Sequence, residues 1–269
     1  MIPLHSDRNV GPATYSELAE RNQLLLSSMF YTYQGEGPFT GQPAIFLRAA
    51  GCNLGDKKAC PWCDAAFEFD RGFITTAPQI AAFTEPYANR AELMVVTGGE
   101  PLLQWKALLP MMKEVNEILD SGQVWQFETN GILLTEEKID EAMQWGLDVH
   151  FVISPKIING KTYQPLDRKM LTDYGDITYL KFVVDADAES PYHNLPSEEE
   201  LEGINVYVSG MTYYGLGDVL GEPGKPVSLF DLSEQGRWRT AMNYRYAAKL
   251  ALERGFNVSY QTHLLGAVE

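Results

Sequence analysis

The three cysteines of the chain lie within twelve consecutive residues. Cys52, Cys60 and Cys63 are separated by gaps of seven and two residues, and Trp62 directly precedes the last of them. There is no fourth cysteine, so one chain can build neither a disulfide framework nor a site of four thiolates. Three thiolates would hold either a zinc ion or an iron–sulfur cluster, with one coordination position left for another ligand. Three incidental buried cysteines are the alternative, but their clustering favours a ligand set.

Two glycine-rich segments carry a carboxylate at the end of an apolar stretch. Gln34-Gly35-Glu36-Gly37-Pro38 follows residues 24–33, and Gly98-Gly99-Glu100-Pro101 follows residues 93–97. Glycine and proline favour turns, and glycine lets the backbone approach a ligand closely. Each segment could therefore bring backbone amides and a carboxylate to a bound molecule. For the first segment, a loop whose Glu36 faces water is the alternative.

Apolar stretches alternate with helical patterns along most of the chain. This alternation predicts an α/β fold with mostly parallel strands and crossover helices. Ligands of such folds lie at the carboxyl ends of the strands, and residues 34–37, 98–100 and 154–156, with Cys52 and Asn130, occur at such ends. The sequence therefore predicts one site there. Strands are expected at residues 24–33, 44–50, 93–97, 124–129, 147–153, 178–184 and 257–262, and helices at 76–88, 101–120, 135–145 and 235–254.

Composition argues against several classes of function. The formal charge is −15, from 21 Lys and Arg against 36 Asp and Glu, which argues against a surface built for nucleic-acid phosphates. No stretch reaches the roughly 18–20 apolar residues of a membrane span, and residues 1–22 lack the apolar core of a signal peptide. With the unpaired cysteines, these features predict a cytoplasmic protein that binds neither nucleic acid nor membrane.

The cysteine loop resembles the cluster loop of radical S-adenosylmethionine (SAM) enzymes. In those enzymes three cysteines hold a 4Fe–4S cluster, and the open iron binds the amino and carboxyl groups of SAM. Gly98-Gly99-Glu100-Pro101 is similar to the glycine-rich motif that contacts the methionine portion of SAM. The resemblance implies a partial, reduced (βα) barrel of the radical SAM type.

A narrower resemblance is to the 7-carboxy-7-deazaguanine synthases. That family contracts the ring of 6-carboxy-5,6,7,8-tetrahydropterin, with loss of ammonia, to a precursor of queuosine. The resemblance implies a lyase that acts as a homodimer, regenerates SAM and receives electrons from a donor of the flavodoxin or ferredoxin type. The matching motifs are Tyr33-Gln34-Gly35-Glu36-Gly37, Phe46-Leu47-Arg48, Cys63-Asp64, Thr97-Gly98-Gly99-Glu100-Pro101, Glu128-Thr129-Asn130-Gly131, Ser154-Pro155-Lys156 and Gln261-Thr262-His263.

By this resemblance the predicted site residues fall into three groups. Glu36 would bind the amidine edge of the pterin, because that edge needs a carboxylate, and the forked cation of Arg48 would bind the pterin carboxylate. The cluster would be held by Cys52, Cys60 and Cys63; SAM by Trp62, Gly99, Glu100, Asn130, Ser154 and Lys156; and the pterin by Gln34, Gly35, Glu36, Arg48, Thr97, His263 and the C-terminal Glu269.

Two features depart from the general pattern. The first cysteine gap is seven residues instead of the three of most radical SAM enzymes, an expansion also known in the narrower family. The threonine that usually follows the Cys-Asp pair and helps to bind Mg²⁺ is replaced by Ala65, which has no side-chain oxygen. Three alternatives stay open: Mg²⁺ is held by Asp64, is held by water and substrate alone, or is not required.

The narrower resemblance extends over residues 24–269, apart from a stretch around 185–232 where an insertion is expected. Residues 1–23 are expected to be an N-terminal extension, for which a partly ordered tail is favoured over a short helix near residues 15–21. Two alternative functions stay open. One is a radical SAM enzyme with another substrate, such as an activating enzyme, and the other is a zinc-binding module without catalysis.

Overall fold

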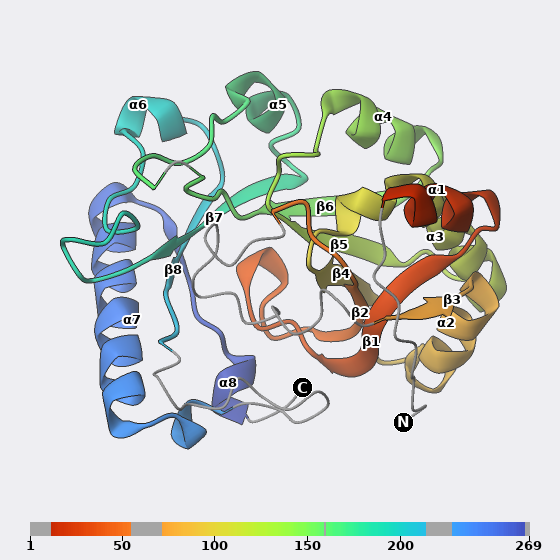
Figure 1. Cartoon of the computed structure of the whole chain (residues 1–269), viewed down its shortest axis with the longest axis horizontal. Coiled ribbons are helices and arrows are strands. Elements are labelled where there is room, and N and C mark those ends of the chain that lie inside the picture. The colour runs from red at the N-terminus through yellow and green to blue at the C-terminus, as the bar shows by residue number, and fades with distance from the viewer. Residues whose placement is uncertain (1–11, 55–71, 159, 214–227, 267–269) are drawn as a thin grey trace. The chain divides into compact units, whose positions relative to one another are not determined.

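The computed structural model describes residues 12–54, 72–158, 160–213 and 228–266 (Figure 1). Of the predicted site residues, Cys60, Trp62, Cys63, Asp64 and Glu269 therefore lie outside the described residues. The chain divides into two compact units, the first made of residues 1–32, 42–55 and 65–151 and the second of residues 33–41, 56–64 and 152–269.

The first unit is an α/β unit whose strands follow the order β3-β1-β2-β4-β5-β6. Strands β2, β4 and β5 are parallel, and β1 pairs with β3 in the antiparallel sense. Its elements are α1 (Pro12–Glu20), β1 (Leu24–Tyr33), β2 (Pro43–Ala49), β3 (Phe73–Thr75), α2 (Ala77–Thr84), η3 (Glu85–Tyr87), β4 (Leu93–Gly98), η4 (Pro101–Gln104), α3 (Trp105–Leu119), β5 (Val124–Thr129), α4 (Glu136–Gln144) and β6 (Asp148–Ile153).

Strand register separates an apolar face of this sheet from a polar one. Leu47, Val96 and Phe127 are partners across β2, β4 and β5, and all three side chains are fully buried. Trp105, at the start of α3, covers this face, since its ring lies 5.7 Å from that of Phe127. Successive side chains of a strand point to opposite faces. The next register pair, Arg48 with Thr97, therefore lies on the other face.

The second unit contains the parallel strands β7, β8 and β9 in that order. The long helix α7 packs against β8 and β9 and runs beside β8 in Figure 1. This packing is close: a Cβ added at Gly210 would lie 2.4 Å from a ring carbon of Tyr244. The elements are η1 (Gly37–Phe39), α5 (Arg168–Asp173), β7 (Thr178–Val184), α6 (Glu198–Leu201), β8 (Val206–Gly210), η5 (Leu229–Asp231), α7 (Glu234–Arg254), β9 (Asn257–Ser259) and α8 (His263–Gly266).

Most predicted elements are present, and the expectation of a mostly parallel α/β fold is confirmed. Several elements differ from the prediction: β3, α5, α6 and α8 were not expected, and β9 ends at Ser259 instead of residue 262. Residues 12–20 form α1, which packs against α3 and η4, so the favoured interpretation as a tail is wrong for them. Strand β8 lies inside the stretch 185–232, so an insertion there can occupy only the rest of that stretch.

Candidate active site

The cysteine loop begins where β2 ends. Gly51 has a φ of +88°, a left-handed conformation that favours glycine, and the half-buried Cys52 follows it. The hydroxyl of Tyr15, on α1, donates to the carbonyl of Ala50 at 3.1 Å. Burial and the neighbouring Cys52 raise the pKa of Tyr15. A residue assigned to the N-terminal extension thus lies against the first predicted cluster ligand, a contact that sequence analysis missed.

Two glycines let the end of β4 lie directly against this loop. A Cβ added at Gly98 would come within 2.1 Å of the carbonyl oxygen of Ala49, and one at Gly99 within 1.9 Å of that of Gly51. The backbone amides of Gly99 and Glu100 donate to these same two oxygens, at 3.1 and 2.8 Å. The segment predicted to contact the methionine portion of SAM therefore lies beside Cys52, as a joint cluster and SAM site requires.

Glu100 is fully buried, and its carboxylate binds the protein itself. Oε1 accepts hydrogen bonds from the amide of Leu102 at 3.1 Å and from the hydroxyl of Thr129 at 2.6 Å. Oε2 accepts one from the amide of Asn130 at 2.8 Å. The side-chain nitrogen of Asn130 in turn donates to Oδ1 of Asn53 at 2.7 Å, next to Cys52. Glu100 thus fixes the ends of β4 and β5 relative to the cysteine loop, while a direct contact with SAM stays a prediction.

Replacing Glu100 with glutamine is expected to lower the free energy of unfolding by about 2–3 kcal/mol. The amide would present a donor where the carboxylate now accepts, and a hydrogen bond to a charged group contributes roughly 1.5–3 kcal/mol. Urea denaturation measures the change. Glu117→Gln, at an exposed position of α3, is the matched control and should be neutral. Equal stability of the two variants would mean that the carboxylate is not structural.

Gln104 is a second structural polar residue that sequence analysis missed. Its Oε1 accepts from the amide of Leu25 at 2.8 Å, and its Nε2 donates to the carbonyl of Leu25 at 2.9 Å. Nε2 also lies 3.5 Å from the carbonyl oxygen of Ala50. It therefore joins η4 to β1 and to the start of the cysteine loop. The available signal was a glutamine within an otherwise apolar run.

Arg48 and Thr97 lie on the polar face of the first unit, as register partners. The guanidinium of Arg48 lies over the ring of Phe30, 5.3 Å from its centroid. Its Nε is buried and has no hydrogen-bond partner among the described residues. A buried guanidinium nitrogen without an acceptor fits the predicted contact with a substrate carboxylate.

Strand β5 adds polar side chains to the same face. Gln126 is the register partner of Val95, two residues before Thr97, and donates to Glu128 at 2.6 Å. Oε1 of Gln126 is buried and lacks a partner among the residues that the structure describes. Glu128 belonged to a matched motif but was given no role, and Gln126 was not predicted at all.

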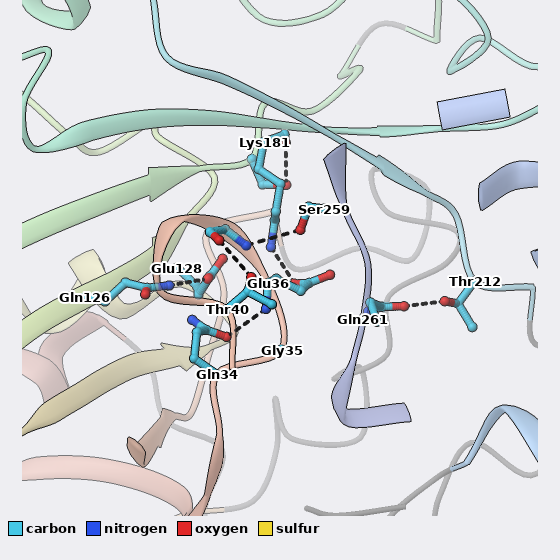
Figure 2. A network of polar contacts seen from close by, with 12 residues as sticks. Gln34, Gly35, Glu36, Thr40, Gln126, Glu128, Lys181, Thr212, Ser259 and Gln261 are labelled. Atoms are coloured by element: carbon cyan, nitrogen blue, oxygen red, sulfur yellow. Dashed lines mark hydrogen bonds and ion pairs between the residues drawn. The ribbon is translucent and has the colours of Figure 1, made fainter. Parts of the chain in front are cut away.

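In the second unit, the loop 34–37 is held by the segment 259–263. The amide of Gly37 donates to the hydroxyl of Ser259 at 3.1 Å (Figure 2), and the amide of Thr262 donates to the carbonyl of Gly35 at 3.2 Å. A Cβ at Gly35 would lie 2.0 Å from Nδ1 of His263, so a side chain there would displace the imidazole ring. The structure therefore brings together three residues predicted for the pterin: Gly35, Glu36 and His263. Gln34 belongs to the same loop, because its Oε1 accepts from the amide of Glu36 at 3.2 Å.

Glu36 is a largely buried carboxylate surrounded by cations. Burial by itself raises its pKa, but Lys181, His263 and Lys156 act against burial and leave the pKa below its ordinary value. Nζ of Lys181 lies 2.6 Å from Oε2 of Glu36 (Figure 2). Glu36 is therefore ionised at neutral pH, as an acceptor for a pterin edge must be. Sequence analysis placed Lys181 in an apolar strand without giving it a role.

Ser154 and Lys156, predicted for SAM, follow β6 in the second unit. The hydroxyl of Ser154 donates to the carbonyl of Lys181 at 3.2 Å. The backbone of Lys156 is fixed by Gln164, whose Oε1 accepts from the Lys156 amide at 3.2 Å and whose own amide donates to the Lys156 carbonyl at 2.9 Å. These hydrogen bonds fix Ser154 and the backbone of Lys156 within the second unit.

Comparison with known proteins identifies the family. Residues 47–174 match the family model of the radical SAM superfamily. The 7-carboxy-7-deazaguanine synthase of Rhodospirillum rubrum is 34% identical over 187 residues, 69% of each chain. That of Rickettsia prowazekii is 31% identical over 252 residues, 92% of this chain and 89% of the relative. The chain belongs to the 7-carboxy-7-deazaguanine synthase family.

Structural comparison supports the same fold for this member of the 7-carboxy-7-deazaguanine synthase family. The crystal structure of QueE from Escherichia coli matches with a TM-score of 0.54 and 19% identity, over 91% of this chain and 97% of that one. The partial radical SAM barrel implied by the resemblance is thereby confirmed as the fold class. In addition, no helix among the described residues is long and apolar enough to cross a membrane. Family membership favours the synthase over the activating enzyme and the zinc module.

Proposed function

We propose that this chain is a radical SAM lyase that converts 6-carboxy-5,6,7,8-tetrahydropterin to 7-carboxy-7-deazaguanine with loss of ammonia. The observation that carries the proposal is the ionised, buried carboxylate of Glu36, held beside His263 in a chain of this family. A carboxylate accepts two parallel hydrogen bonds from a planar N–H edge. The 2-amino group and N3–H of a pterin form such an edge.

The radical SAM family implies two cofactors, a 4Fe–4S cluster and SAM. Cys52, with Cys60 and Cys63, would hold the 4Fe–4S cluster, and Gly99, whose lack of a side chain lets it lie against the cysteine loop, would bind SAM beside it. When bound, these groups supply a carbon radical that removes a hydrogen atom from the substrate. Asn130, Ser154 and Lys156 would orient SAM, with Trp62 beside its adenine.

Side chains of this chain would bind the pterin substrate and orient it. Glu36 would accept the two N–H donors of the pterin, with Gln34 supporting the backbone of the loop. Arg48 would bind the substrate carboxylate through its unpartnered nitrogen, beside Thr97. The C-terminal carboxylate of Glu269, six residues after His263 in the sequence, would reach the same substrate.

Three further elements of the proposal come from the family resemblance. The enzyme would act as a homodimer and accept electrons from a flavodoxin or ferredoxin type donor. Any Mg²⁺ would rest on Asp64, water and substrate, since Ala65 offers no ligand. Adding Mg²⁺ to chelator-treated enzyme tests this last element, and an unchanged rate would remove Mg²⁺ from the cofactors. Sedimentation analysis tests the dimer.

The experiment that tests the function is anaerobic turnover followed by mass spectrometry. Reconstituted protein, reductant, SAM and 6-carboxytetrahydropterin are incubated together. We expect a product lighter than the substrate by one ammonia, formed only when SAM is present. If 5′-deoxyadenosine accumulates without that product, radical chemistry stands and the pterin assignment is wrong.

A further inference from the structure

Lys181 is a buried lysine on β7 with no assigned role. Its side chain is 7% exposed, and its strand neighbours Leu180 and Phe182 are fully buried. A buried ammonium is costly unless it is paired, and Figure 2 shows the side chain directed at the carboxylate of Glu36. The 2.6 Å distance from Nζ to Oε2 makes this a charge-assisted hydrogen bond.

The ion pair uses one side of the carboxylate. Lys181 occupies Oε2, while the described residues place no hydrogen-bond donor on Oε1. The backbone on either side is fixed, because the amide of Glu36 donates to Gln34 and that of Gly37 to Ser259, and the bond to Lys181 restricts rotation of the carboxylate. One oxygen is thus anchored, and lone pairs of the group remain for a ligand.

The pair also sets the charge that a ligand meets. A lone buried carboxylate favours a cationic partner, because a cation supplies both the charge and the donors. Lys181 at 2.6 Å, with His263 and Lys156 nearby, already supplies positive charge to the Glu36 carboxylate. An uncharged ligand edge with N–H donors then binds Glu36 better than an amidinium or a guanidinium does. The ammonium of Lys181 would repel the positive charge of those two groups.

We propose that Lys181 is a positioning and specificity-determining residue, which anchors Glu36 and makes the site select an uncharged N–H edge over a cationic one. This inference rests on the proposed function, in which Glu36 binds the pterin. The carbonyl of Lys181 also accepts a hydrogen bond from the hydroxyl of Ser154, which is predicted to bind SAM. Lys181 therefore contacts one residue predicted to bind the pterin, Glu36, and one predicted to bind SAM, Ser154.

Two fluorescent probes separate this role from a purely structural one. 6-Carboxypterin presents the uncharged 2-amino-4-oxo edge, and 2,4-diaminopteridine-6-carboxylate presents an edge that protonates beside a carboxylate. Binding is measured by anaerobic fluorescence titration with the reconstituted protein that holds its cluster. The wild-type protein should prefer 6-carboxypterin. Lys181→Met should bind it about tenfold more weakly and shift the preference towards the diamino probe by a similar factor.

Controls make the outcome decisive. Lys181→Arg keeps the charge and should retain the preference. Lys169→Met removes the lysine of an exposed ion pair, 2.7 Å from Asp173, and should behave as wild type. Equal affinity and preference in wild type and Lys181→Met would overturn the inference, whereas failure of wild type to bind 6-carboxypterin would overturn the proposed function. If Lys181→Met does not fold, Lys181→Gln carries the same expectation.

The pH dependence of binding gives a second readout. Among the described residues, the titratable groups that act on Glu36 are Lys181 on β7, Lys156 after β6, His263 on α8 and Tyr244 on α7. Lys181 lowers the pKa of Glu36 and burial raises it, so removing the lysine should raise this pKa. The loss of 6-carboxypterin binding on acidification should therefore occur at a higher pH in Lys181→Met than in wild type. A role limited to stability would leave this profile unchanged.

Discussion

Cys52→Ala is expected to yield a folded protein that retains no iron–sulfur cluster and forms no detectable product. Cys60→Ala is expected to give the same result. With three cysteines in the chain, each loss leaves two thiolates, too few to hold a cluster that keeps one iron open. Iron and sulfide analysis after anaerobic reconstitution measures the loss, together with the turnover assay.

Stability provides the control for this prediction. Cys52 is half-buried, and its Sγ makes a weak contact of 3.7 Å with Oδ1 of Asn53. Its truncation should therefore change the free energy of unfolding by no more than about 1 kcal/mol. A Cys52→Ala protein that keeps its cluster and full activity would remove Cys52 from the ligand set.

Gly99→Ala is expected to lower kcat/KM by about a hundredfold or more and to lower the free energy of unfolding by about 1–3 kcal/mol. The new methyl group would lie 1.9 Å from the carbonyl oxygen of Gly51, a backbone atom that no side-chain rotation can move. Strand β4 and the cysteine loop must therefore separate, and overpacking of this kind costs about 1–3 kcal/mol. A displacement of about 1 Å in a reacting site can cost ~10²-fold in rate.

Gly122→Ala is the matched control, because a Cβ there meets no atom within 4 Å and its φ is not left-handed. Thermal unfolding, SAM binding and turnover are compared for both variants. If Gly99→Ala binds SAM and turns over substrate like Gly122→Ala, the close contact between Gly99 and the cysteine loop is not essential for activity.

The sequence predicted the elements that have strong local signals. The run from Leu24 to Tyr33 is a strand with the expected bounds. The helix expected at residues 235–254 begins one residue earlier, at Glu234, after the cap Ser233, and ends before Gly255. Caps and an amphipathic pattern are local, so a single sequence contains them. Strand β8 was missed, because its five residues are too few to show a period.

The candidate site was predictable in its residue types but not in its contacts. Gly35, Glu36 and His263 were grouped from motifs, and the structure places them together. Glu100 was predicted to bind SAM, which stays a prediction, but its bonds to the hydroxyl of Thr129 and the amide of Asn130 were not foreseen. Lys181 lies 145 positions from Glu36 in the sequence. Such pairings depend on tertiary packing, which no local pattern encodes.

The bonds between residues 34–37 and 259–263 have a consequence for synthesis of the protein on the ribosome. Gly35 and Gly37 receive their partners from residues 227 and 222 positions later. The loop that carries Glu36 is therefore synthesised more than two hundred residues before the segment that supports it. Contacts of such long range form late in folding. A nascent chain that has not reached residue 259 thus lacks the bonds that fix the loop around Glu36.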